Sequence, residues 1–82
     1  PFEGRIAIRY EIHRASTVTV KIYDLSGRLV RILQPQIRQR AGAYTLTWDG
    51  HDANGRRLPN GTYFIELIAN HHVKTGKLLL LR

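Results

Sequence analysis

Two aspartates near the middle of the chain are the first candidates for chemistry, because their spacing resembles that of a metal-binding loop. Asp49, Asp52 and Asn54 lie close together and are followed by Gly55. A calcium loop of the EF-hand type needs oxygen donors at alternate positions and a bidentate glutamate that closes it. The intervening residues break this alternation, and no glutamate follows. We therefore expect Asp49 and Asp52 to accept hydrogen bonds from backbone N–H groups in consecutive turns, without a metal.

The other polar side chains form no recognisable catalytic set. Ser16 and Ser26 are the only serines, and neither lies in a nucleophile-elbow pattern. Glycosidase chemistry would need two carboxylates facing a cleft, which a chain of 82 residues rarely has. The adjacent His71 and His72 would point to opposite sides of an extended chain, so they could not bind one zinc ion together. Their position is that of a hairpin tip. We expect no enzyme activity, no cofactor and no metal.

The aromatic residues raise the question of carbohydrate binding, since sugar-binding sandwiches display flat rings. Trp48 shares the parity of Tyr44 and Leu46, so alternation along a strand predicts that it packs in the core. On a later strand, Phe64 and Ile68 share the face of Glu66, which is predicted to point away from the core. They leave a modest apolar patch of the kind that contacts another domain.

The net charge of +7 arises from ten arginines and three lysines against six acidic residues. Such a surplus favours anionic partners, among them a surface polysaccharide, or it serves as a solvated surface that keeps the domain soluble. The basic residues are not interleaved with aromatic residues that could stack on bases. Nucleic acid is therefore not an expected partner.

Length and composition indicate one globular domain over residues 1–82. The chain has no cysteine, which excludes disulfides and thiolate sites. No apolar run approaches the ~20 residues of a membrane span. The chain begins at Pro1 and lacks methionine, so we expect it to be the C-terminal part of a longer polypeptide.

Apolar and polar residues alternate along most of the chain, which predicts β-strands and no helix. Gln34 to Gly42 is polar, contains Pro35, and is predicted to be a loop that crosses between sheets. Asn70 to His72 is predicted to form a hairpin loop. About seven short antiparallel strands of this kind indicate an all-β, Ig-like or fibronectin III-like sandwich. The clearest strands are predicted over residues 6–12, 17–22, 28–33, 44–48, 63–69 and 73–81.

The last predicted strand ends in four consecutive leucines, which cannot all face one core because alternate side chains point to opposite faces. Two should pack inward. The other two are covered either by a neighbouring domain, subunit or export receptor, or within the domain by residues such as Ile37, Leu29 or Leu33. The candidate partner contacts are Phe64, Ile68, Lys77, Leu78, Leu79, Leu80 and Leu81.

The order of the motifs resembles that of a known family. Pro1-Phe2 is similar to the end of its opening motif, and residues 8–12 to its first strand. Residues 20–28 are similar to its Val-x-Ile-Tyr-Asp-x-x-Gly-Arg hairpin, residues 48–55 to its Trp-Asp-Gly turn, residues 61–64 to Gly-x-Tyr-Phe, and residues 77–81 to its closing strand. Gly76 departs from the pattern at a position where a bulkier residue would fit. The motif positions are Asp24, Gly27, Trp48, Asp49, Gly50, Asp52, Gly55, Gly61 and Tyr63.

This pattern is similar to the Ig-like domain of FlgD-type flagellar hook-capping proteins and to the C-terminal sorting domains of type IX secretion. The resemblance implies a non-catalytic module of an extracellular bacterial protein, which directs type IX secretion and attachment to the cell surface. Its partners would be the secretion machinery, a neighbouring domain or like subunits. One alternative is a structural subunit or spacer of a flagellar hook cap or surface filament, assembled by edge-strand pairing. Another is an accessory carbohydrate-binding module.

Overall fold

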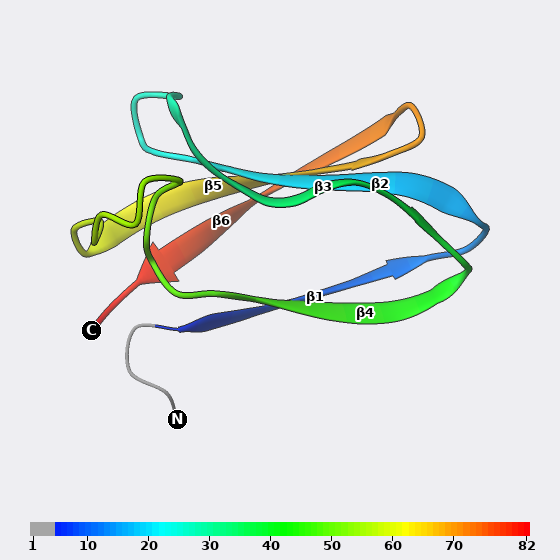
Figure 1. The fold of residues 1–82 in the computed structure, drawn as a ribbon, viewed down its shortest axis with the longest axis horizontal. Helices are drawn as coiled ribbons and strands as arrows, with labels where there is room; N and C mark the ends of the chain where they lie inside the picture. Colours follow the sequence, from blue (N-terminus) through cyan, green and yellow to red (C-terminus); the bar gives the residue numbers. More distant parts are fainter. Residues whose placement is uncertain (1–4) are drawn as a thin grey trace.

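The computed structural model describes residues 5–82, which form two antiparallel β-sheets packed face to face (Figure 1). One sheet has two strands in the order β1-β4, and the other has four in the order β3-β2-β5-β6. This confirms the all-β sandwich, although the described residues form six strands where about seven were predicted. The strands are β1 (Ile6–Ile12), β2 (Ser16–Tyr23), β3 (Leu29–Gln39), β4 (Gly42–Trp48), β5 (Gly61–Ala69) and β6 (His72–Leu80).

The small sheet forms because both of its strands alternate between apolar and polar residues in matching register. Ile8 lies opposite Leu46, and Tyr10 lies opposite Tyr44. Residues directly opposite each other share a face, so these side chains all point toward the four-stranded sheet. The rings of Tyr10 and Tyr44 stack with their centroids 5.5 Å apart. The interior of the sandwich therefore begins on this face.

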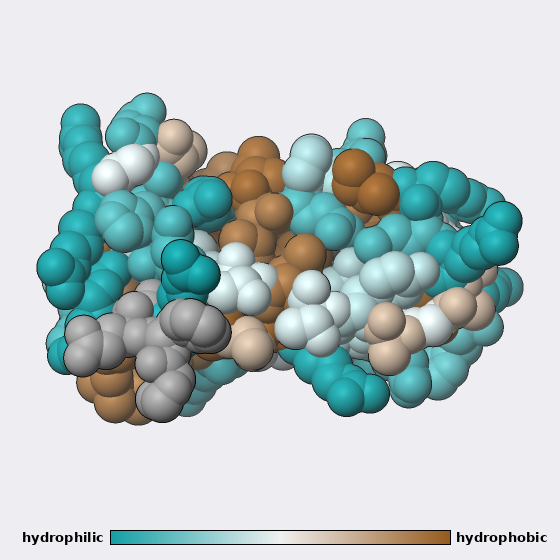
Figure 2. All heavy atoms as spheres, turned by 60° about the horizontal axis from the view of Figure 1, so that its bottom comes forward, coloured by the Kyte–Doolittle hydropathy of each residue, from teal (hydrophilic) through white to brown (hydrophobic). Residues whose placement is uncertain are grey.

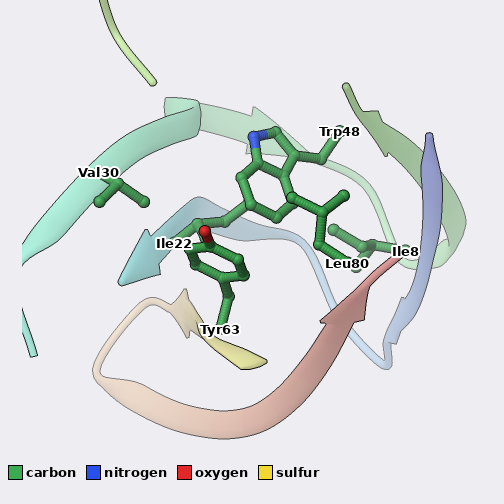
Figure 3. Packing of buried hydrophobic residues seen from close by; sticks show 6 residues of the cluster. All are labelled: Ile8, Ile22, Val30, Trp48, Tyr63 and Leu80. Atoms are coloured by element: carbon green, nitrogen blue, oxygen red, sulfur yellow. The ribbon is translucent and has the colours of Figure 1, made fainter. Parts of the chain in front are cut away.

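Trp48 lies at the centre of the core and is fully buried, as its parity predicts. Figure 3 shows that side chains from both sheets surround it. Its ring meets that of Tyr63 edge-on, with the centroids 5.2 Å apart, and its indole N–H donates to the carbonyl of His51 at 3.0 Å. This main core cluster consists of Ile8, Ile22, Val30, Trp48, Tyr63 and Leu80, and a second cluster contains Tyr10, Ile12, Val18 and Val20.

The loop predicted over residues 34–42 is wrong, because β3 continues to Gln39. Pro35 is tolerated inside the strand because, among the described residues, β3 is an edge strand that pairs only with β2. Gln34 pairs with Val20 and Ile37 pairs with Val18, so one extra residue bulges out around the proline. The buried amide of Gln34 donates to the Tyr10 hydroxyl at 3.1 Å. A polar side chain that looked like loop sequence is therefore part of the interior.

The terminal leucines divide between two faces, as predicted. Leu80 is fully buried and Leu78 packs against the main core, whereas Leu79 and Leu81 are 60% and 65% exposed. The suggested cover by residues of β3 is wrong, because β3 and β6 are opposite edges of the sheet. The two outer leucines remain at the surface. Within residues 5–82 the structure has no helix long and apolar enough to cross a membrane.

Candidate interaction surfaces

Two turns at one end of the sandwich have the same hydrogen-bond pattern. Asp24 Oδ1 accepts hydrogen bonds from the backbone N–H groups of Ser26 and Arg28, both at 3.0 Å. Asp52 Oδ1 accepts from the N–H groups two and four positions further on, both at 2.9 Å. In both turns the aspartate N–H also donates to the carbonyl four residues later, at 2.9 Å. This confirms the prediction that Asp52 caps a turn, and it shows that the sequence Asp-x-x-Gly-Arg occurs twice with one geometry.

These hydrogen bonds also set the ionisation of the carboxylates. The Ser26 hydroxyl and then the Arg28 N–H hold the pKa of Asp24 below its usual value. For Asp52 the Arg56 N–H is the main cause of a lowered pKa. Burial tends to raise the pKa of Asp49, but the backbone N–H of His51 and nearby positive charges outweigh it. The charged form of each carboxylate is thus stabilised by the turn that it holds together.

The C-terminal Arg82 fastens the β4–β5 loop, a role that nothing in the sequence pattern indicated. Its Nη1 donates to the carbonyl of Leu58 at 2.6 Å, and its Nη2 donates to the carbonyl of Gly50 at 2.9 Å. Gly50 has φ +77°, and a Cβ there would collide with the Arg82 guanidinium. Glycine is therefore favoured at position 50 for two reasons: its backbone is left-handed, and the Arg82 side chain approaches it closely.

The predicted motif residues gather at the end of the sandwich where the β2–β3 and β4–β5 loops meet the C-terminus (Figure 1). The Ala53 N–H donates to the Val30 carbonyl at 3.1 Å and joins the two loops. Tyr63 lies below them in the core, with its hydroxyl donating to the Pro59 carbonyl at 2.6 Å. Gly27 and Gly55 adopt φ values of +89° and +79° in their turns. The motif thus builds a scaffold, while Pro1-Phe2 lies outside the described residues.

The predicted partner contacts do not form one surface. Phe64 lies opposite Lys77 in the register of β5 and β6, on the outer face that Leu79 and Ile68 share. Phe64 and Ile68 are only half-buried. Leu80, by contrast, belongs to the core, together with its partly buried neighbour Leu78. The outer face of the four-stranded sheet is therefore the part of this set that a partner could reach.

Apolar side chains also reach the surface elsewhere. On the face shown in Figure 2 they gather across the middle and at the lower left, and hydrophilic side chains cover most of the rest. Contiguous apolar surface rimmed by polar residues is typical of protein contacts. The large hydrophobic residues exposed in the described chain are Leu25, Leu29, Ile32, Ile37, Val73, Leu79 and Leu81.

Comparison with known proteins identifies the family of this scaffold. The family model of the FlgD Ig-like domain matches residues 3–72. The basal-body rod modification proteins FlgD of Salmonella typhimurium and Salmonella typhi are each 44% identical over 57 residues, which cover 70% of this chain and 24% of theirs. The chain thus spans about a quarter of the length of these relatives.

Solved structures agree with this match. FlgD from P. aeruginosa superposes with a TM-score of 0.72 at 30% identity, covering 92% of this chain and 58% of that one. FlgD from Xanthomonas campestris, described in connection with hook capping essential for flagellar assembly, superposes with a TM-score of 0.68 at 31% identity. This match covers 93% of this chain and 55% of that one.

The relatives correct the expected location. They are named for the flagellar basal body and hook, so the expectation of a protein secreted to the cell surface is wrong. They give no support to type IX sorting, to the secretion machinery as partner, or to polysaccharide binding. Their names describe structural roles and no catalysed reaction. The chain belongs to the FlgD Ig-like domain family.

Proposed function

We propose that this chain is a non-catalytic module of a flagellar hook-capping protein and presents a rigid protein-binding surface during hook assembly. The observation that carries the proposal is the 44% identity over 57 residues to basal-body rod modification proteins. A structure with the same fold comes from a protein linked to hook capping. This favours the flagellar alternative that the sequence motifs had raised.

The geometry of the domain supports a role in protein contact. The carboxylates of Asp24 and Asp52 are engaged by backbone N–H groups, which makes them turn supports. Large apolar side chains such as Leu79 and Val73 remain exposed on the four-stranded sheet. Burial of apolar surface is the main driving force of protein association. A stable sandwich with exposed apolar side chains fits a scaffold that binds other subunits.

A domain exchange tests this proposal. Residues 1–82 replace the matching segment of the FlgD protein of Salmonella typhimurium, and hooks are counted by electron microscopy beside swimming in soft agar. We expect the exchanged protein to form hooks that a strain lacking the segment does not form. The control with Trp48→Ala should fail, because loss of the fully buried ring destabilises the core, whereas Thr47→Ser at an exposed position of the two-stranded sheet should not matter. An exchanged protein that is abundant and folded, yet forms no hooks, would contradict the proposal.

A further inference from the structure

One side of the sandwich is open, because two strand edges face each other there without pairing. Within residues 5–82, β1 pairs only with β4, and β6 pairs only with β5. Between them lie two hollows of about 270 and 370 Å³. Both hollows are lined by Glu11, His13, Leu67 and Lys74, so they form one continuous groove between β1 and β6.

The floor of this groove is the side of the hydrophobic core. Ile8 and Tyr10 reach it from β1, and Ile65 and Leu67 reach it from β5. Ile65 and Leu67 are only partly buried, although both pack against the core clusters. An occupant with apolar side chains would therefore complete a core that one side leaves open to water.

Gly76 makes room for such an occupant in the wall formed by β6. It lies in the middle of the strand and lines the groove. Among the described residues, a Cβ at this position would meet only Ile65 Cγ2, at 3.4 Å, so the backbone of β6 leaves room for an added Cβ. Glycine inside a strand often marks a place where another backbone approaches closely. The absence of a side chain at Gly76 keeps the groove open.

The two edges of the four-stranded sheet differ in their protection. β3 contains Pro35, and its pairing with β2 shows three shifts of register, which are features that block the addition of a strand. β6 contains no proline, and its nine pairs with β5 run without a shift. Its outer edge therefore offers a regular row of backbone donors and acceptors. Recognition by strand addition uses an edge of this kind.

The walls of the groove carry mostly positive charge. Arg9, Arg14 and Lys74 line it, and none of them forms an ion pair within residues 5–82. Glu11 is the single carboxylate among the lining residues of the described chain. An approaching segment with acidic side chains would be attracted, and a basic one would be repelled.

We propose that the groove between β1 and β6 receives an extended segment of a partner protein in which apolar and acidic side chains alternate. The segment adds beside β6 as a further strand. Its apolar side chains cover Ile65 and Leu67 on the inner face, and its carboxylates lie on the outer face of the sheet, where Lys77 of β6 is exposed. Since a strand presents alternate side chains to opposite faces, one segment can satisfy both requirements. This inference does not depend on the flagellar role.

A synthetic seven-residue peptide that alternates valine and glutamate is the probe. It is titrated into the isotope-labelled 82-residue chain, and amide shifts and hydrogen exchange are followed by NMR. We expect the resonances of the amides on the free edge of β6 to shift and these amides to exchange more slowly. A peptide with lysine in place of glutamate should bind at least about tenfold more weakly. No binding, or shifts confined to the β3 edge, would overturn the proposal. Concentration-dependent protection of the groove without peptide would overturn it too, because a second copy would then be the occupant.

Two variants separate binding from folding. Gly76→Val suits an extended strand but fills the groove, so the melting temperature should be kept while the affinity falls about tenfold. Thr62→Val places the same kind of side chain on the outer face of the sheet and should bind normally. Lys74→Glu should weaken binding of the acidic peptide and strengthen binding of the basic one. If Gly76→Val and Lys74→Glu bind both peptides as the parent chain does, the groove is not the binding site.

Discussion

The ring of Trp48 joins the two sheets, and its N–H joins the end of β4 to the loop that follows. Its ring packs among apolar side chains of the four-stranded sheet, and its N–H reaches the carbonyl of His51. Burial of the ring followed from its parity with Tyr44 and Leu46. The hydrogen-bond partner could not be predicted, because it depends on how the following loop folds back over the core.

Replacement of Trp48 by alanine should cost about 3–5 kcal/mol of unfolding free energy, since it removes a fully buried aromatic side chain and leaves a cavity. This is a large part of the total stability of a small domain. Urea unfolding followed by circular dichroism measures it, with the exposed Leu81→Ala as the matched control. A loss below about 1 kcal/mol would contradict the central position of Trp48.

The two aspartate turns should make the stability depend on acid. The folded pKa values of Asp24 and Asp52 lie below those of the unfolded chain, near the usual ~3.9. Their stabilisation is therefore fully present above that value and is lost as the pH falls through the folded pKa. Asn keeps an oxygen acceptor but cannot ionise. The double variant Asp24→Asn, Asp52→Asn should thus show a smaller drop in melting temperature between pH 5 and pH 2.5 than the parent chain does. If the drop is the same in both, these carboxylates are not the source of the acid-dependent loss of stability.

At the level of strands, the alternation of apolar and polar residues was sufficient to predict a strand where one face is buried and the other is solvated. It predicted β1 to within a residue and placed the two inward leucines of β6 correctly. It failed in β3, where Pro35 and several polar residues suggested a loop. An edge strand needs hydrogen bonds on one side only, and this tolerance becomes visible only once the order of the strands is known.

The two faces of β6 give a matched pair of variants. Leu80→Ala removes a fully buried side chain and should cost about 2–5 kcal/mol. Leu79→Thr changes an exposed position on the same strand and should stay within about 0.5 kcal/mol. Chemical denaturation of both variants measures the difference. Equal losses would mean that the register of β6 is not the one described.

The loop that Arg82 fastens gives a second pair. Gly50 and Gly55 have nearly the same left-handed φ, so alanine costs about 1–2 kcal/mol of backbone strain at either position. Only at Gly50 would the new Cβ also displace the Arg82 guanidinium. We expect Gly50→Ala to lose more stability than Gly55→Ala, and Arg82→Ala to reduce that difference. Equal thermal shifts for the two glycine variants would show that the Arg82 contact contributes nothing.

At the scale of the whole molecule, the groove proposed as a binding site lies between two strands that are distant in sequence. Composition and alternation predicted a basic β-sandwich and the motifs that hold its turns. They could not predict the groove between β1 and β6, because it arises where two strands distant in sequence fail to pair. They also could not choose between a flagellar and a secretion role, since the motifs shared by both specify the fold.

The location of the protein in the cell tests the central claim most directly. An antibody against this module, applied with gold label to hook–basal bodies and to intact cells of the organism that encodes it, shows where the protein acts. A hook-capping role predicts label at the end of the growing hook and loss of that label once the gene is removed. Label spread over the cell surface, with hooks unlabelled and assembled normally in the deletion strain, would contradict the account.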